Sequence, residues 1–164
     1  MILNMVGSNP AMNKELFRIE NLVKRYNITV LNQLNLTVLE NDYISIIGKS
    51  GSGKSTLIHI LGLMDSYDEG SIFFHGQPLN PNSDHASIRA QSIGFIFQSY
   101  NLIPHLSAEK NIVLPAVFSN LDYDHKRMKA LYEHLNIEHL LDTDVSVLSG
   151  GEKQRVAICR ALLF

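Results

Sequence analysis

GKSGSGKS, the stretch at residues 48–55, fits the pattern G-x-x-x-x-G-K-[S/T] that binds phosphate groups. A short apolar run (YISII, residues 43–47) precedes it, and an apolar segment (TLIHILGL, residues 56–63) follows it. A strand, a glycine-rich loop and a helix in this order are the context that the motif requires. The sequence therefore predicts a phosphate-binding loop between a buried strand and a buried helix.

Each residue type in this loop has a physical reason. Glycines allow backbone angles and close approaches that a Cβ would block. The helix that starts near Lys54 adds free N–H donors and the positive end of its dipole. Lys54 can reach the β- and γ-phosphates, and the Ser55 hydroxyl can ligate Mg²⁺. The phosphate-binding residues predicted here are Gly48, Lys49, Ser50, Gly51, Ser52, Gly53, Lys54, Ser55 and Thr56. His59 in the following helix is interpreted as packed rather than catalytic.

Composition narrows the class of protein. The chain has 164 residues, 45% hydrophobic and 18% charged, which is typical of a globular domain with a real core. The net charge of −2 does not indicate the basic surface that nucleic-acid binding requires, so we expect no nucleic-acid partner. Cys159 is the single cysteine, which excludes an intrachain disulfide and suits a reducing compartment. No apolar run reaches the ~18 residues of a membrane span, and the N-terminus does not resemble a secretory signal.

The chain divides by pattern into a tail and two halves. Residues 1–13 are predicted to be a flexible tail, with Met12 an alternative start. Residues 14–98 form a strand-rich core. Within it we expect an edge strand at 16–22, a half-exposed strand at 34–39, a strand and turn at 70–76, a polar loop at 77–85 and a buried strand at 93–97.

Residues 99–164 are predicted to be helical. Ser107 can cap a helix that runs through Phe118 and is kinked or ended near Pro115. Residues 123–136 are amphipathic. Ser149 opens the last helix, and Glu152 stands at the spacing of a capping box.

Two further motifs stand in order around the loop. One is LSGGEKQRVA at residues 148–157, and the other is IGFIFQ at residues 93–98. Tyr26 precedes the loop in a polar turn. Together these stretches resemble the ATP-binding subunits of ABC transporters over residues 14–164. LSGGEKQRVAICRALL resembles the ABC signature motif, Gln98 the Q-loop glutamine, and Tyr26 the aromatic A-loop residue.

The resemblance implies a fold and a site. The fold would be α/β: a P-loop NTPase of the ABC ATPase kind, with an antiparallel β edge, a parallel core sheet and a helical subdomain. The cofactors would be ATP and Mg²⁺. Lys54 and Gln98 would be the catalytic residues, and Gln98 would contact Mg²⁺ and help to position water. The Tyr26 ring, rather than its hydroxyl, would stack on adenine. Ser149, Gly150 and Gly151 would bind the γ-phosphate held by a second subunit, in a head-to-tail dimer.

The branch of the family can be narrowed by the same resemblance. ILGLMDSYDEGSIFFHG and IGFIFQSYNLIPHLSAEKNIVLP resemble the lipoprotein-releasing, macrolide and antimicrobial-peptide exporters. Such an ATPase would lie on the inner face of the cytoplasmic membrane and export a lipoprotein, peptide, bacteriocin or drug. A transmembrane permease subunit would contact it through the loop from Ser99 to Ser107.

The family's Walker B strand, with its Asp and the catalytic Glu after it, has no match here. We therefore expect a chain that is truncated before that strand, incomplete at its C-terminus and inactive alone. Asp65, Glu69, Asp142 and Asp144 do not stand in a Walker B context.

Other interpretations stay open from the residues alone. A small P-loop kinase or GTPase would need an acceptor site or an N-K-x-D motif, and neither is present. A non-hydrolysing nucleotide-binding fragment is a second alternative. A third is a soluble ABC ATPase that is not tied to transport and acts on ribosomes or DNA, against which the near-neutral charge and the loop from Ser99 to Ser107 argue.

Overall fold

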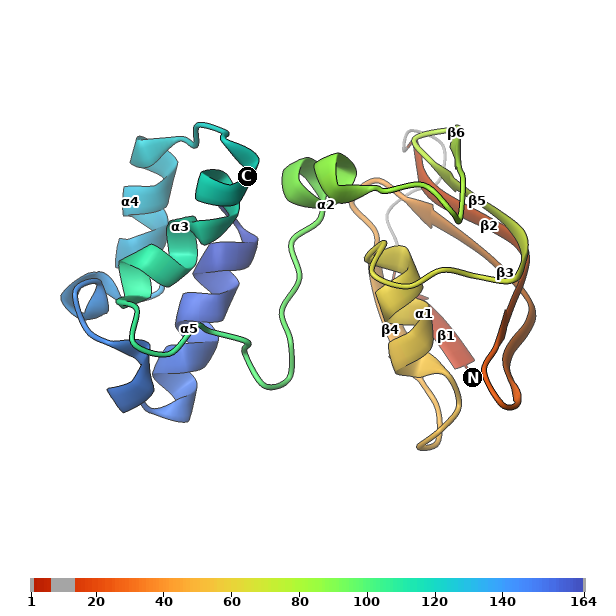
Figure 1. Ribbon diagram of the computed structural model, residues 1–164, viewed down its shortest axis with the longest axis horizontal. Helices are drawn as coiled ribbons and strands as arrows, with labels where there is room; N and C mark the ends of the chain where they lie inside the picture. Colours follow the sequence, from red (N-terminus) through yellow and green to blue (C-terminus); the bar gives the residue numbers. More distant parts are fainter. Residues whose placement is uncertain (1, 7–13, 164) are drawn as a thin grey trace. The chain divides into compact units, whose positions relative to one another are not determined.

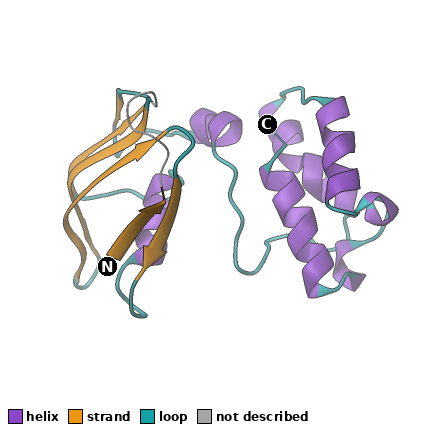
Figure 2. Cartoon of the chain, turned by 180° about the vertical axis from the view of Figure 1, so that it is seen from behind, coloured by secondary structure: helices purple, strands orange, loops and turns teal. Residues whose placement is uncertain are grey.

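The computed structural model describes residues 2–6 and 14–163 (Figure 1). It divides into two compact units, Met1–Asp84 and His85–Phe164. The described strands all belong to the first unit and most of the helical residues to the second, as the colouring of Figure 2 shows. The sequence pattern predicted this boundary between residues 98 and 99. The boundary lies earlier because the helix α2 (Ala86–Ser92), which the sequence did not predict, contacts α3 in the helical half.

The first unit is built on a four-stranded antiparallel sheet in the order β3-β2-β5-β6. The strands are β2 (Glu15–Arg25), β3 (Thr29–Leu39), β5 (Glu69–Phe74) and β6 (Gln77–Leu79). The antiparallel strands expected from the sequence are therefore present. Strand β6 occupies the start of the predicted polar loop, since His75 and Gly76 turn the chain back on itself with positive φ angles.

Strand β2 is an inner strand of this sheet, and the prediction of an edge strand at 16–22 was wrong. It pairs with β3 on one side and with β5 on the other. Ile19 lies opposite Leu36 in one pairing and opposite Ile72 in the other, and all three side chains are buried. The polar residues of β2 indicated an edge strand. In an antiparallel sheet, however, the face opposite the core can also be polar in an inner strand.

A second, two-stranded sheet pairs β1 (Ile2–Val6) with β4 (Tyr43–Ile47) in antiparallel register. Residues 2–6 were expected to be part of a flexible tail, and instead their backbone pairs with β4. The rest of that predicted tail, residues 7–13, lies outside the described residues. Strand β4 was expected to be buried on both faces, yet Tyr43 and Ile47 at its ends are exposed.

No parallel pair occurs among the strands of residues 2–6 and 14–163, so the parallel core sheet predicted from the resemblance is not found in this part of the chain. Residues 93–97, predicted to be a buried strand, have no regular secondary structure. Their side chains alternate between half-buried and exposed, which explains the sequence pattern. A strand also needs a paired strand beside it, and none of the strand pairings among the described residues includes 93–97.

The second unit is a helical bundle whose main helices follow the predicted pattern. After α2 come α3 (Ala108–Ser119), α4 (His125–His134) and α5 (Gly150–Ala161), with 3-10 turns at Glu138–Leu140 and Val145–Val147. Ser107 caps α3 as expected, and Pro115 lies inside that helix. The fully buried core side chains include Ile112, Met128, Ile137, Val156 and Cys159.

Candidate functional site

The glycine-rich loop joins β4 to α1 (Lys54–Leu61), which is the strand, loop and helix order predicted from the motif. Gly53 is the N-cap residue of α1 and has a left-handed φ of 85°. A Cβ there would lie 2.9 Å from Leu31 Cδ2 and 3.0 Å from the Val30 carbonyl oxygen. Backbone angle and available space therefore both require glycine at this position.

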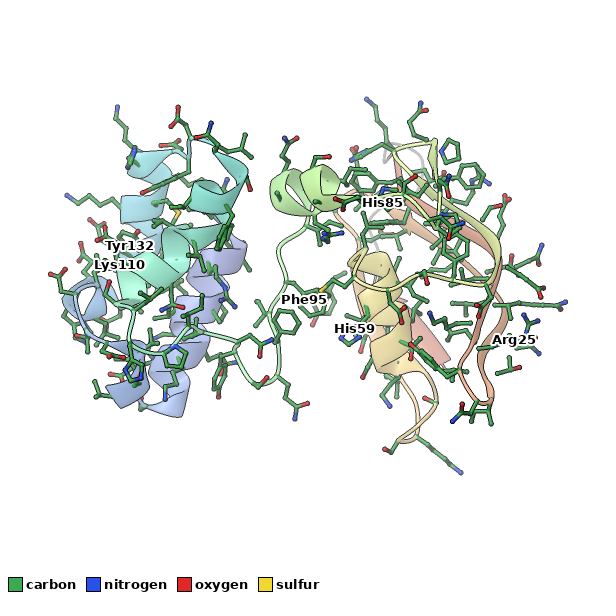
Figure 3. The ribbon with its side chains drawn as sticks, viewed as in Figure 1. Arg25, His59, His85, Phe95, Lys110 and Tyr132 are labelled. Atoms are coloured by element: carbon green, nitrogen blue, oxygen red, sulfur yellow. The ribbon has the colours of Figure 1, made fainter. Side chains whose placement is uncertain are left out.

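Helix α1 buries one side, with Leu57 and Ile60 in the core. Ile58 and His59, the latter labelled in Figure 3, are exposed, so the predicted burial of the whole helix was wrong. An amphipathic helix of this kind is anchored through one face. At its N-terminus, Gly53 lies against Val30 and Leu31 of β3.

The Lys54 ammonium is held by the loop itself. Its Nζ donates to the carbonyl oxygens of Gly48 at 2.9 Å and Lys49 at 2.8 Å. The Ser52 N–H also donates to the Lys49 carbonyl oxygen, at 3.2 Å, which tightens the loop. No acidic residue occurs in the first turn of α1, all of which is described, so no carboxylate of that turn offsets the positive helix end.

One polar atom of the loop lacks a partner. Ser52 Oγ is buried and has no hydrogen-bond partner within the described part of the chain. A buried hydroxyl left unpaired costs free energy. Together with the Lys54 ammonium and the left-handed Gly53 at the start of α1, the Ser52 hydroxyl gives this loop donors of the kind that a polyphosphate needs.

The next two residues extend this site into α1. Ser55 is exposed at the start of the helix, and Thr56 is half-buried. An exposed hydroxyl beside bound phosphates can serve as one Mg²⁺ ligand. Among the described residues, no group of three or more His, Cys, Asp or Glu side chains could hold a metal ion. The Mg²⁺ ligands predicted from the sequence are Ser55 and Gln98.

Tyr26 follows the end of β2 and belongs to the same unit as the loop. Its side chain is 58% exposed, and its hydroxyl donates to Asp65 Oδ2. That hydrogen bond raises the pKa of the Tyr26 phenol, and Thr56 contributes a smaller hydrogen-bonding effect of opposite sign. The structure thus brings Tyr26 together with Asp65, in the segment after α1.

Sequence reasoning missed two residues around Tyr26. Lys24 is buried, and its ammonium contacts Asp65, which was considered only as a substitute for the Walker B carboxylates. The alternation of a regular strand does not indicate Lys24, because Leu22, Val23 and Lys24 are buried in succession and β2 ends at Arg25, before Tyr26. Nothing local indicates Asp65, because it lies on the far side of α1 in the sequence.

Gln98 and the SGG stretch belong to the second unit, whereas Tyr26 and the loop belong to the first. Gln98 lies in a turn directly after residues 93–97 and is exposed.

In the same unit, Asn111 of α3 is fully buried. Its Oδ1 accepts from the Ile103 N–H at 2.6 Å, and its Nδ2 donates to the Ile103 carbonyl oxygen at 3.1 Å. The Arg160 guanidinium donates to the Tyr100 and Asn101 carbonyl oxygens at 2.7 Å each. The loop from Ser99 to Ser107 (residues 99–107) is therefore fastened to α3 and α5.

Ser149 and Glu152 form the predicted capping box at the start of α5. Ser149 Oγ accepts from the Glu152 N–H at 3.4 Å, and a Glu152 carboxylate oxygen accepts from the Ser149 N–H at 2.7 Å. Hydrogen bonds from Ser149 lower the pKa of Glu152. A Cβ on Gly150 would lie 3.5 Å from the Tyr100 hydroxyl, and one on Gly151 would lie 3.7 Å from Arg155 Nη1. Both are ordinary contacts, so the packing of this unit does not itself require glycine there.

A cavity of about 300 Å³ lies in the second unit and is lined partly by Phe95, Phe97, Pro115 and Arg160. It contains none of the predicted site residues. The chemistry of a phosphate site resides in its donors and not in an enclosed volume, so the loop remains the candidate site. Among the helices described, none combines the length and the apolar character needed to cross a bilayer.

Known proteins are similar to this chain over the residues described above. A family model described as "ABC transporter" matches residues 31–164. The macrolide export ATP-binding/permease protein MacB of Pasteurella multocida is 40% identical over 161 residues, which are 93% of this chain and 25% of that protein. MacB 2 of Yersinia pestis is 39% identical over 165 residues, which are 95% of this chain and 24% of that protein. The chain thus spans about a quarter of the length of these curated relatives.

Solved structures are similar to the chain over most of its length. A dimeric ATP-binding cassette in a post-hydrolysis state, bound to ADP and Pi, is 34% identical with a TM-score of 0.77, over 90% of this chain and 69% of that one. A cassette from Clostridium perfringens that is part of an ABC transporter complex is 27% identical with a TM-score of 0.74, over 92% of this chain and 62% of that one.

Proposed function

This chain belongs to the ABC transporter family and has the P-loop NTPase fold of its ATP-binding cassettes, and from this premise we propose that it is the ATP-binding component of an exporter. One observation carries the proposal. The Lys54 ammonium lies inside a loop that needs glycine at Gly53 and that opens directly into the N-terminus of α1. This arrangement is suited to the β- and γ-phosphates of ATP.

We infer that the loop residues 48–56 hold the phosphates and that Ser55 ligates Mg²⁺. The unpartnered Ser52 hydroxyl in the described chain, the Lys54 ammonium and the acid-free first turn of α1 support this assignment. When bound, Mg²⁺ would neutralise charge on the phosphate oxygens. The chain's own contribution is to bind and orient: backbone N–H groups and Lys54 fix the phosphates, and Tyr26 offers its ring to the base.

The remaining site residues lie in the second unit. We propose that Ser149, Gly150 and Gly151 bind the γ-phosphate held by another copy of the chain, in a head-to-tail dimer, and that Gln98 contacts Mg²⁺ and water. Support comes from the capped N-terminus of α5, which presents free N–H groups, and from two glycines that the packing of this unit does not require. One similar solved cassette is a dimer.

Export and its partners form the wider part of the proposal. The two curated relatives are named as macrolide export ATP-binding/permease proteins. We propose that this chain works with a transmembrane permease, through the loop from Ser99 to Ser107, on the inner face of the cytoplasmic membrane. The Asn111 and Arg160 hydrogen bonds would make that loop rigid enough to transmit movement to α5. The cargo would be a lipoprotein, a peptide, a bacteriocin or a drug.

We further propose that residues 1–164 alone bind ATP without turning it over. Three of the four carboxylates considered as substitutes for a catalytic base are engaged elsewhere. Asp65 contacts Lys24 and Tyr26, Glu69 pairs with Arg25 at 2.7 Å, and Asp144 accepts from the Ser146 N–H at 2.7 Å. A general base must be within reach of the attacking water, and these contacts direct the carboxylates to the protein itself.

Equilibrium titration with ATP and Mg²⁺ tests the proposed function. We expect the wild-type chain to bind ATP and Lys54→Ala to lose most of that affinity, because the cation in the loop is gone. Lys129→Ala, which removes an exposed lysine from α4, is the matched control and should bind as the wild type does. Equal affinity for Lys54→Ala and Lys129→Ala would refute the phosphate-binding loop.

A further inference from the structure

A buried lysine and a carboxylate support the predicted base-stacking residue. Lys24 lies near the end of β2 and is only 6% exposed. Its Nζ donates to Asp65 Oδ1 and to the Ser66 carbonyl oxygen, each at 2.7 Å. A buried ammonium is tolerated when it is paired and hydrogen-bonded, as here. These contacts tie the end of β2 to the segment after α1.

The second oxygen of the same carboxylate holds Tyr26. The Tyr26 hydroxyl donates to Asp65 Oδ2 at 2.5 Å, and Lys24 Nζ lies over the Tyr26 ring, 4.9 Å from its centroid. Asp65 therefore uses one oxygen for the ammonium and the other for the phenol. The ring is fixed at its hydroxyl end and has a cation over one face, while most of the side chain stays exposed.

We propose that Asp65, together with Lys24, is a positioning residue that holds the Tyr26 ring ready to stack on the purine base of the nucleotide. The inference rests on the proposed function, because it needs ATP in the neighbouring loop. An exposed tyrosine that follows a strand can rotate, and binding would then have to freeze that rotation. A ring that is already held loses less freedom on binding, so affinity rises without any new contact to the nucleotide.

A positioning role for Asp65 changes what is expected of the Tyr26 hydroxyl. If stacking alone mattered, Tyr26→Phe would be nearly silent, because phenylalanine offers a similar flat ring. With the Asp65 hydrogen bond in place, Tyr26→Phe frees the ring and weakens binding. The effect should fall on the base and spare the phosphates, since the Lys54 contacts lie within the loop.

Two ligands separate positioning from a general structural role. ATP reaches both the loop and Tyr26, whereas inorganic tripolyphosphate carries no base and reports on the loop alone. Tyr26→Phe and Asp65→Ala should each bind ATP about two- to tenfold more weakly, the factor that corresponds to one net hydrogen bond. Their affinity for tripolyphosphate, measured by the same calorimetric titration, should equal that of the wild type.

The double variant and the controls complete the experiment. Because both substitutions remove one bond, Tyr26→Phe with Asp65→Ala should bind ATP no more weakly than the weaker single variant. Tyr43→Phe and Asp122→Asn, at exposed positions in β4 and in the loop before α4, should match the wild type. Asp65→Ala leaves Lys24 buried without its carboxylate, so circular dichroism must confirm its fold. Tyr26→Phe keeps that ion pair and decides the question if Asp65→Ala does not fold.

The outcomes distinguish the positioning role of Asp65 from the proposed ATP site on which it depends. Unchanged ATP affinity in Tyr26→Phe would overturn the positioning role, as would a parallel loss of ATP and tripolyphosphate. In both cases a wild type that binds both ligands, and a Lys54→Ala variant that loses both, would leave the ATP site standing. A wild type that binds neither ligand would overturn the proposed function, and the positioning role with it.

Discussion

The ammonium of Lys24 lies 2.7 Å from Oδ1 of Asp65, a residue 41 positions further along the chain. This pair joins β2 to the segment that follows α1, on either side of the phosphate-binding loop in the sequence. The other oxygen of the same carboxylate, Oδ2, accepts a hydrogen bond from the Tyr26 hydroxyl.

The Asp65 pair predicts a dependence of stability on pH. Partial burial raises the pKa of Asp65, but hydrogen bonds from Lys24 and Tyr26 outweigh this, and the net pKa is lowered. A carboxyl with a lowered folded pKa contributes stability above its unfolded pKa of about 3.9, and that contribution is lost as the pH falls through the folded value. In urea unfolding, the free-energy difference between wild type and Asp65→Asn should therefore be constant above pH 5 and shrink below about pH 4. Asp122→Asn should show no such change, and a pH-independent difference for Asp65→Asn would contradict the assignment.

Gly53→Ala should destabilise the protein more than Gly51→Ala. Both positions have positive φ, 85° and 78°, and a non-glycine residue there costs roughly 1–3 kcal/mol. Only Gly53 adds a steric conflict, with Leu31 and Val30, whereas a Cβ on Gly51 meets nothing within 4 Å in the described structure. Thermal unfolding of the two variants measures the difference. A lower melting temperature for Gly51→Ala than for Gly53→Ala would show that steric contact is not the deciding factor.

Ser149→Ala should reduce the free energy of unfolding by about 1 kcal/mol, because it removes the N-cap of α5. Ser149→Thr keeps a hydroxyl at the same place and should restore most of this stability. Urea titrations followed by circular dichroism provide the measurement. If both variants lose equal stability, the capping hydrogen bond is not the cause.

Gly150→Asp should leave ATP binding to a single chain intact and abolish hydrolysis by the native transporter. A carboxylate there would face the γ-phosphate bound by the second copy and repel it. Gly150→Ala is the control, since a Cβ makes only ordinary contact with Tyr100, 3.5 Å away. Mixing Gly150→Asp with Lys54→Ala leaves one composite site with both motifs unchanged, so partial phosphate release should return. Nucleotide-dependent dimers formed by Gly150→Asp alone would argue against action in trans.

Local patterns in the sequence were enough to predict several features of this protein. The glycine-rich loop, the strand before it and the helix after it follow from residues 43–63. The Ser107 cap of α3 and the capping box of Ser149 and Glu152 were also predicted from the sequence. In each case the atoms that interact are neighbours in the chain, so the local sequence contains the whole interaction.

Tertiary structure decided the rest. Whether a strand is inner or edge depends on its neighbours: β2 lies between β3 and β5, and residues 93–97 have no strand partner in the described chain. Residues 2–6 pair with β4, although their own sequence did not indicate it. The contact of Lys24 and Tyr26 with Asp65 spans α1 and the phosphate-binding loop. The physical reason is the same throughout: these interactions join residues far apart in the chain, and only the folded backbone brings their donors and acceptors within hydrogen-bonding distance.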